Sequence, residues 1–372
     1  MKEVNEYVRS CQSLHNPELQ YLIATIDLKP RKMPEESAKS RLSRASNPIP
    51  DSFFSELITA NHILHHHSIV DAYGHISARN PQNPSTFFLS GSIAPALVSS
   101  RSSIIEYNMS DGSPVSAPEG TKHYLERFIH SALYAAYRDV QSVIHAHAAP
   151  VLPYSITSIP LRPVYHMAAC IGPQAPVFDI SLHYSTIATS SEPQDLLIRT
   201  PALGTALAGA FSPGTVLSRT KNFIQNIYSR PAEHAPPLPS HPVVLMRGHG
   251  FTCTGTSVRE AVFRAVYTVA NAGVQSQAMA MQGAWNVSML GEQVAGIHVK
   301  NGNGGASGSK GEGIKYLSER EVKDAAESIG GTAGRAWGLW ERDVQGTGIY
   351  VNEYLQDEEK EEEGGEEEAE EE

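Results

Sequence analysis

Short apolar runs alternate with longer helical segments through residues 51–290, and this alternation constrains the fold more than any other feature. GHISARNP, TFFLSG and VQSVIHAHA are typical of short strands, whereas FFSELITANHILHHH and SVREAVFRAVYTVANAGVQ show the apolar spacing of helices. TKHYLERFIHSALYAAYRDV also predicts an amphipathic helix, and PLRPVYHM and PVFDI are strand-like. Strands interleaved with helices predict an α/β domain.

Composition divides the rest of the chain. Residues 1–50 are polar and rich in Pro, Ser and charge, which predicts a flexible N-terminal extension. We expect the main domain to span 51–290, with an insertion at about 183–240 that either covers a site or extends a surface loop. A C-terminal extension (291–355) and an acidic tail (356–372) follow.

The formal net charge of -11 comes from the tail. Twelve of the 40 acidic residues and one of the 29 basic residues lie in QDEEKEEEGGEEEAEEE, so 28 of each sign remain elsewhere. The main domain therefore has no basic excess that would attract a nucleic acid. The tail is expected to be solvated and disordered, and docking onto a basic partner is the alternative.

Cysteine usage and hydropathy indicate a reducing, aqueous compartment. Cys11, Cys170 and Cys253 are too few and too scattered for a disulfide framework. The first twenty residues carry charges throughout, and no window reaches the roughly 18 uninterrupted apolar residues of a membrane span. We therefore expect a cytoplasmic protein without a membrane partner.

Two histidines one residue apart follow a buried strand. On a strand, side chains repeat every second residue, so His145 and His147 would point to the same face and could hold one ion together. Two hydrogen-bonded histidines at a strand end are the alternative. A catalytic zinc site usually has three protein ligands, and His249 in RGHGF, where glycines permit a tight bend, is the candidate third.

A glutamate lies in the predicted helix before this histidine pair. Within YLERFIHSALY, Glu126 occupies an otherwise apolar stretch and could act as a general acid or base beside a metal. A surface carboxylate paired with Arg127 or Lys122 is the alternative. His130 lies four residues later, on the same helical face, and is a candidate to orient the carboxylate.

Together these motifs resemble the class II aldolase/adducin family. GHISAR, Glu126, IHAHA nineteen residues later and RGHG before a long helix occur in that order, and the resemblance covers about residues 53–290. It implies a three-layer α/β/α sandwich around a central mixed or antiparallel sheet. It also implies a homo-oligomer, commonly a tetramer, with sites at subunit contacts.

The same resemblance implies roles for individual residues. His145, His147 and His249 would bind a divalent metal, usually zinc, with Fe²⁺, Mn²⁺ and Co²⁺ as alternatives, and Glu126 would transfer protons. Ser90 and Gly91 in LSGS match an oxyanion turn of the family, although such a sequence is also an ordinary turn.

Departures from the sugar-phosphate aldolases bear on the substrate. His75 stands at an Asn position of the family, and Tyr124 and Leu125 replace a pair of phosphate-binding serines. Because leucine offers no donor to a phosphate dianion, a sugar phosphate is disfavoured. His75 or Lys122 would instead hold a second anionic group of the substrate.

The segment PLRPVYHMAA carries one more candidate. His166 lies about where family aldolases place a leaving-group tyrosine, so it is a candidate proton donor, with Tyr165 or a core role as alternatives. The phrasing LSGSIAPALV, YLERFIHSALY and PLRPVYHMAA is similar to a branch of the family that contains decarboxylases of hydroxylated aromatic acids.

These features predict a divalent-metal-dependent carbon–carbon lyase acting on a small molecule through a metal-stabilised enolate. A decarboxylase of a hydroxylated aromatic or oxo or hydroxy acid is favoured slightly over an aldolase on a non-phosphorylated substrate. The alternatives are a metal-dependent dehydratase or oxygenase on the same scaffold and a non-catalytic adducin-like interaction protein.

Overall fold

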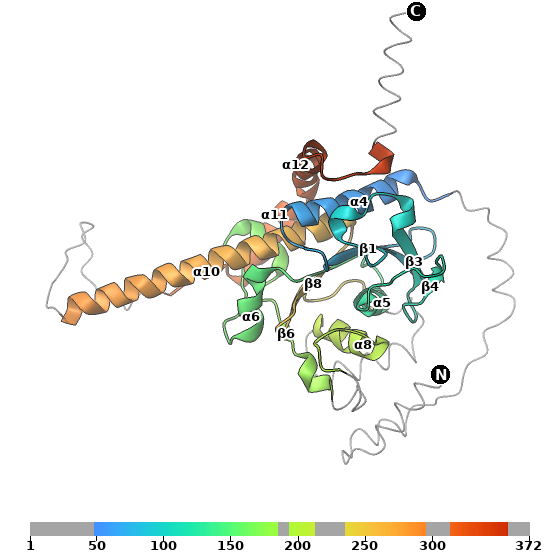
Figure 1. Cartoon of the computed structure of the whole chain (residues 1–372). Helices are drawn as coiled ribbons and strands as arrows, with labels where there is room; N and C mark the ends of the chain where they lie inside the picture. The colour runs from blue at the N-terminus through green and yellow to red at the C-terminus, as the bar shows by residue number, and fades with distance from the viewer. Residues whose placement is uncertain (1–47, 185–192, 213–234, 295–312, 356–372) are drawn as a thin grey trace, which may run out of the picture.

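The computed structural model describes residues 48–184, 193–212, 235–294 and 313–355. These residues contain an eight-stranded mixed sheet in the order β4-β3-β2-β1-β5-β8-β7-β6 (Figure 1). The strands are β1 (His75–Arg79), β2 (Thr86–Ser90), β3 (Ile104–Asn108), β4 (Pro114–Ser116), β5 (Ser142–Ala146), β6 (Val177–Phe178), β7 (Val243–Met246) and β8 (Gly250–Gly255). Neighbouring strands are antiparallel except for the parallel pair β6 and β7.

Helices flank the sheet. The α-helices described are α4 (Asp51–His66), α5 (Arg127–Ala136), α6 (Leu152–Ile156), α8 (Pro201–Ala210), α10 (Val258–Val294), α11 (Glu319–Gly330) and α12 (Ala333–Gly346). Short 3-10 helices are η1 (Pro95–Leu97), η2 (Arg101–Ser103), η3 (Ala149–Val151), η4 (His166–Ile171) and η5 (Ile180–His183). Among these residues, no helix combines the length and apolar character needed to cross a bilayer.

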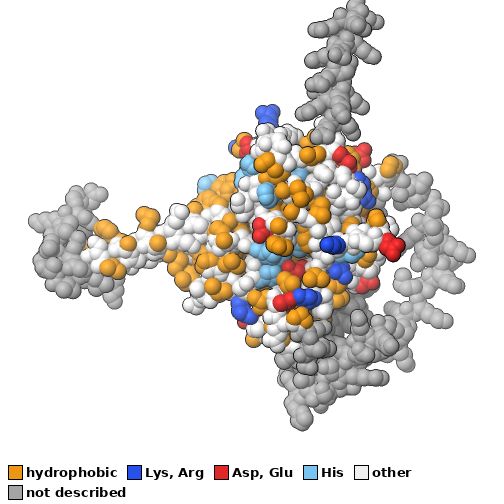
Figure 2. Space-filling model, viewed as in Figure 1, with side chains coloured by type: hydrophobic (Ala, Val, Ile, Leu, Met, Phe, Trp, Pro, Cys, Tyr) orange, Lys and Arg blue, Asp and Glu red, His pale blue; other side chains and the backbone are white. Residues whose placement is uncertain are grey.

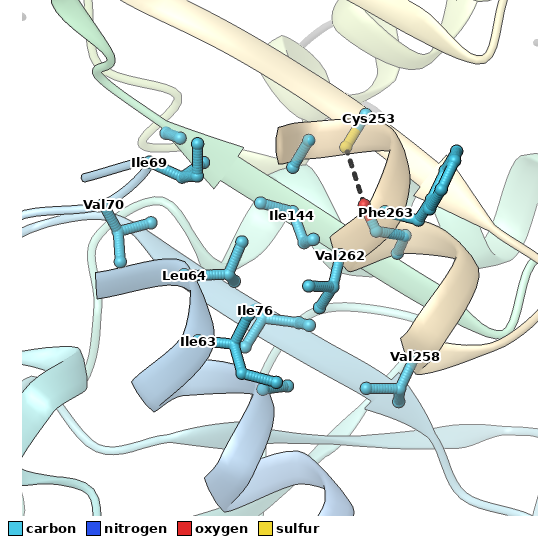
Figure 3. Close-up of a cluster of buried hydrophobic side chains, with 14 of the residues drawn as sticks. Ile63, Leu64, Ile69, Val70, Ile76, Ile144, Cys253, Val258, Val262 and Phe263 are labelled. Carbon is cyan, nitrogen blue, oxygen red and sulfur yellow. Dashed lines mark hydrogen bonds between the residues drawn. The ribbon is translucent and has the colours of Figure 1, made fainter. Parts of the chain in front are cut away.

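Side-chain alternation along the strands builds a hydrophobic core on each face of the sheet. On β5, Ile144 belongs to the cluster formed with α4, α10 and α12 (Figure 3), whereas its neighbour Val143 belongs to the cluster formed with α5 and α8. In the first cluster, Ile63 of α4 and Val262 of α10 are fully buried. The predicted α/β fold is confirmed, with helices packed against both faces of the sheet.

The long helix α10 begins in the core and ends beyond it. The apolar spacing that predicted this helix faces the core at its start, because Val262 and Ala265 are fully buried and Val269 packs against the same hydrophobic cluster. Farther along, Met281 and Trp285 are exposed, and the projecting part carries hydrophobic and uncharged side chains (Figures 1 and 2). The predicted domain boundary at 290 falls inside this helix.

Two predicted elements differ from the structure. The helix expected over 121–140 spans only Arg127–Ala136, and Leu125 is exposed instead of joining its apolar face. The strand expected in PLRPVYHM is reduced to a single bridge between Leu161 and Ala175. Pro163 explains the second difference, because proline has no backbone N–H to donate to a strand partner.

Several predictions fall outside the described residues. They are the acidic tail, almost all of the N-terminal extension, 185–192 and 213–234 of the insertion, and 295–312 of the C-terminal extension. The described part of the insertion includes α8, which packs closely on α5. A Cβ at Gly204 of α8 would lie 2.3 Å from the carbonyl oxygen of Phe128, so only glycine allows this approach.

Candidate metal centre

Strand β5 places the first two histidines. His145 is fully buried and pairs directly with His75 of β1, on the sheet face that α5 covers. Its Nδ1 lies 3.1 Å from the carbonyl oxygen of Phe251, which can only accept, so Nδ1 carries the proton and Nε2 is left for a ligand. His147 follows the strand, and its Nε2 lies 3.0 Å from the Nε2 of His145.

The turn between β7 and β8 supplies the third histidine. Gly248 has a φ of 63° and Gly250 a φ of 158°, values that favour glycine at both sides of His249. A Cβ at Gly250 would lie 2.1 Å from the carbonyl oxygen of Ala146 at the end of β5. This close approach brings the Nε2 of His249 to 3.1 Å from the Nε2 of His147.

Replacing Gly250 by Ala should therefore disrupt the centre. We expect the free energy of unfolding to fall by about 3 kcal/mol, because a backbone strand must move away from β5. Gly273→Ala is the matched control, because nothing lies within 4 Å of a Cβ at that α10 position. Denaturant unfolding and zinc titration of both variants check this; equal stability of the two would contradict it.

Glu126 completes the group from the residue immediately before α5. Its Oε2 lies 3.4 Å from the Nε2 atoms of both His145 and His249, and its Oε1 accepts from the backbone amide of Ile198 at 2.9 Å. The side chain is 8% exposed, which excludes the surface alternative. The ligand atoms of Glu126, His145, His147 and His249, here called the His3Glu cluster, all lie within 4.8 Å of one another.

The charges of the His3Glu cluster suit a divalent cation. Burial alone would raise the pKa of Glu126, but His145 and His249 together hold that pKa well below its usual range. Burial lowers the pKa of His145, and it lowers that of His147 to about 4, so burial favours the unprotonated form of both imidazoles. The cluster therefore offers nitrogen lone pairs and one carboxylate, the donor set of zinc sites.

The spacing of these nitrogens also fits a metal. The Nε2 of His147 faces the Nε2 atoms of His145 and His249 at 3.0 and 3.1 Å, and a cation between these nitrogens would remove the repulsion between their lone pairs. Zinc at about 2.1 Å from each nitrogen in tetrahedral geometry would space them at about 3.4 Å. A shift of a few tenths of an ångström would therefore accommodate the ion.

Buried neutral histidines make stability depend on pH. Burial lowers the pKa of His130 to about 3 and of His62 to about 4, from 6.5 when unfolded. The unfolded chain therefore binds more protons below pH 6.5, and each such histidine lowers the free energy of unfolding by about 1.4 kcal/mol per pH unit of acidification. Urea unfolding of metal-free protein at pH 7 and pH 5 checks this; unchanged or greater stability at pH 5 would contradict it.

The other predicted site residues come from β2, the segment before α5, and η4. Ser90 ends β2 and is buried, and Gly91 follows it. Lys122 has an exposed side chain, and its carbonyl oxygen accepts from the amide of Ser92 at 3.0 Å, which places it against the Ser90–Gly91 turn. His166 is exposed at the start of η4, which packs on α10 and α11, and it is not a member of the His3Glu cluster.

His75 and His130 form a pair that the sequence did not predict. The His75 ring lies 5.3 Å from that of His145 and 4.5 Å from that of Tyr124. The prediction that His130 orients Glu126 is wrong: its Nε2 lies 2.7 Å from the Nδ1 of His75 instead. Glu126 precedes the helix, so the spacing of four residues does not align the two side chains. Its actual partner, the amide of Ile198, has no signal in sequence.

Comparisons with known proteins agree with this geometry. Residues 55–276 match the family described as the class II aldolase and adducin N-terminal domain. The decarboxylase tropJ of Talaromyces stipitatus is 40% identical over 296 residues, which cover 79% of this chain and 95% of that protein. The chain belongs to the class II aldolase and adducin family. Together with its decarboxylase relative, this makes it a lyase of the aldolase or decarboxylase type.

Two further comparisons extend the picture of this class II aldolase homologue. The 3,4-dihydroxyphthalate decarboxylase of Arthrobacter keyseri is 27% identical over 229 residues, which cover 60% of this chain and 77% of that protein. An aldolase II superfamily structure from Pseudomonas syringae has a TM-score of 0.52 at 16% identity, covering 84% of this chain and 98% of its own. That structure shows the shared fold.

Proposed function

We propose that this chain is a divalent-metal-dependent decarboxylase of a small hydroxylated aromatic acid. The observation that carries the proposal is the convergence of three imidazole Nε2 atoms and one carboxylate within 4.8 Å. The names of the two decarboxylase relatives support the reaction type, and one of them names a hydroxylated aromatic acid.

His145, His147 and His249 would hold the ion. Three imidazole ligands favour zinc, although Fe²⁺, Mn²⁺ and Co²⁺ accept the same ligands. A divalent cation bound there supplies a Lewis acid for the negative charge that develops as the carbon–carbon bond breaks. The carbonyl oxygen of Phe251 would orient the His145 ring, and the glycine turn would bring the backbone of His249 close to β5.

Glu126 would move the proton. Its Oε1 is held by the amide of Ile198, which leaves Oε2 to accept the proton of a substrate phenol. The proton would pass from Oε2 to the ring carbon that bears the carboxylate, which converts the phenolate to a ketone. The carbon–carbon bond would then break, carbon dioxide would leave, and the electron pair of that bond would restore the aromatic ring as a phenolate, which takes a proton from water.

The surroundings favour a substrate without phosphate. The Tyr124 hydroxyl donates to the carbonyl oxygen of Ile93, and the Leu125 side chain is exposed and apolar, so neither replaces the serines of sugar-phosphate aldolases. We propose His75 and Lys122 as the groups that hold a second anionic substituent, with Ser90 and Gly91 forming the adjoining turn. His166 would join the site only in a homo-oligomer, from another copy of the chain.

Metal analysis and product detection together test this proposal. We expect purified chain to retain about one divalent ion, and to release carbon dioxide from hydroxybenzoate or dihydroxyphthalate substrates. Treatment with a chelator should abolish the release, and added zinc should restore it. Aldehyde release from non-phosphorylated aldol substrates without any decarboxylation, or full activity of metal-free protein, would overturn the proposal.

A further inference from the structure

A chain of buried polar side chains runs from the metal centre into the core beneath α5. The Nδ1 of His75 lies 2.7 Å from the Nε2 of His130, and the Nδ1 of His130 lies 2.6 Å from the Oγ of Ser77. The Oγ of Ser77 in turn lies 2.7 Å from the hydroxyl of Tyr134. His75 and Ser77 are on β1 and the other two on α5, so the two elements face each other through these hydrogen bonds.

These four hydrogen-bonded side chains are buried away from solvent. They are at most 2% exposed, and Phe87 stacks on the His130 ring. Each neutral imidazole carries one proton and one lone pair, so a proton at one end fixes the donor at every following bond. A buried donor without an acceptor is energetically costly, so only one order of donors and acceptors along these hydrogen bonds is favourable.

The Tyr134 end sets that direction. Among the described residues, the Oγ of Ser77 is the hydrogen-bond partner of the Tyr134 hydroxyl, so the hydroxyl hydrogen of Tyr134 donates to Ser77. The Ser77 hydroxyl must then donate to the Nδ1 of His130. If His130 donated to Ser77 and Ser77 to Tyr134 instead, the hydroxyl hydrogen of Tyr134 would have no acceptor among the described residues. The Nε2–H of His130 therefore donates to the Nδ1 of His75. His75 is left with its proton on Nε2.

That Nε2 is the nitrogen of His75 available to a substrate. His75 pairs with His145 across the sheet and lies on the same face, 5.3 Å between ring centres, and none of the described residues hydrogen-bonds its Nε2. Tyr124 covers the His75 ring at 4.5 Å and limits its rotation.

We propose that His130, Ser77 and Tyr134 are positioning residues that fix His75 as a hydrogen-bond donor beside the metal centre. This rests on the proposed function and deepens it, because a fixed donor selects a substrate with an acceptor oxygen next to the reacting group. The chemistry favoured is a second carboxylate, which only accepts hydrogen bonds when ionised. A substrate that carries only a hydrogen-bond donor next to the reacting group should bind poorly, because it would face the N–H of His75.

The location of the proton can be measured without any turnover. Full-length protein labelled with ¹⁵N-histidine should show a coupling between the His130 Nε2 and the His75 Nδ1 through their hydrogen bond, with the proton on His130. The His75 Nε2 should also carry a proton. A proton on the Nδ1 of His75 would overturn the proposal, whether or not the protein proves to be a decarboxylase.

Kinetics then separate positioning from a merely structural role. We compare a dihydroxyphthalate with the dihydroxybenzoate that lacks its second carboxylate, using His130→Met, which removes the donor, and His130→Gln, which keeps one. His130→Met should raise KM about tenfold for the phthalate alone, and His130→Gln should recover part of that loss. Equal changes for both substrates, or no difference between Met and Gln, would overturn the proposal.

Ser77→Ala provides a second route if His130→Met does not fold. It removes the hydroxyl that satisfies His130, and we expect the same selective rise in KM. Ser142→Ala is its matched control, because Ser142 is also a fully buried strand serine and donates to the backbone carbonyl of Ser77 at 2.8 Å, outside the side-chain relay. Zinc content should stay at wild-type level in all four variants. Identical KM ratios in Ser77→Ala and Ser142→Ala would contradict the assignment.

Discussion

Glu126→Gln is expected to abolish turnover while leaving the bound metal near one ion per chain. The amide oxygen can still accept from Ile198, so the side chain keeps its place, but it can no longer take up a proton. Loss of a general acid or base typically lowers kcat by a factor of about 100 to 10,000. Stopped-flow or steady-state detection of carbon dioxide, with metal analysis of the same sample, measures both effects.

Glu106→Gln is the control for this substitution. Glu106 lies on β3 of the same sheet, and its carboxylate accepts from Asn80 and Thr86 away from the His3Glu cluster. We expect wild-type turnover in that variant. Because Oε2 of Glu126 lies only 3.4 Å from two ligand nitrogens, the carboxylate is close enough to be a ligand itself. If Glu126→Gln loses metal as fully as it loses activity, the residue is a ligand and not the proton carrier.

His249→Ala is expected to weaken metal binding by more than a hundredfold and to remove activity with it. Outer partners of ligands typically contribute 10- to 100-fold to affinity, so a direct ligand should contribute more. His249 lies on a turn with its side chain 9% exposed, and its loss should disturb the core less than loss of the fully buried His145. Competitive zinc titration against a chelating dye measures the affinity.

His123→Ala is the matched control here. The ring of His123 contacts the Tyr107 hydroxyl at 2.8 Å and lies outside the His3Glu cluster. Its removal should leave zinc affinity unchanged. Equal affinity of the His249→Ala and wild-type proteins would show that the third ligand has been misidentified.

Strands β1, β2 and β5 and the convergence of the three histidines could be predicted because local patterns determine them. The period of two along VIHAHA predicted a common face for His145 and His147, and the glycines around His249 predicted the bend that brings it near. Apolar spacing likewise identified α4 and the core stripe of α10. These features depend on backbone geometry within a few residues.

The remaining features depend on contacts between distant segments. Apolar spacing could not predict where α5 begins, because the residues before it are held by distant segments. The Tyr124 hydroxyl donates to the carbonyl oxygen of Ile93, and Glu126 accepts from the amide of Ile198. The partner of His130 is on β1, 55 positions earlier, and no helical periodicity points to it. Ile198 acts through its backbone amide, which is the same in every residue but proline.

X-ray absorption at the zinc edge can show whether the three imidazoles bind one ion. Zinc-loaded, full-length protein should show three imidazole nitrogens at about 2.0 to 2.1 Å and one further light-atom ligand. The imidazole signal should fall to two rings in His249→Ala protein reconstituted at high zinc. A zinc environment without imidazole scattering, or one that His249→Ala leaves unchanged, would contradict the account.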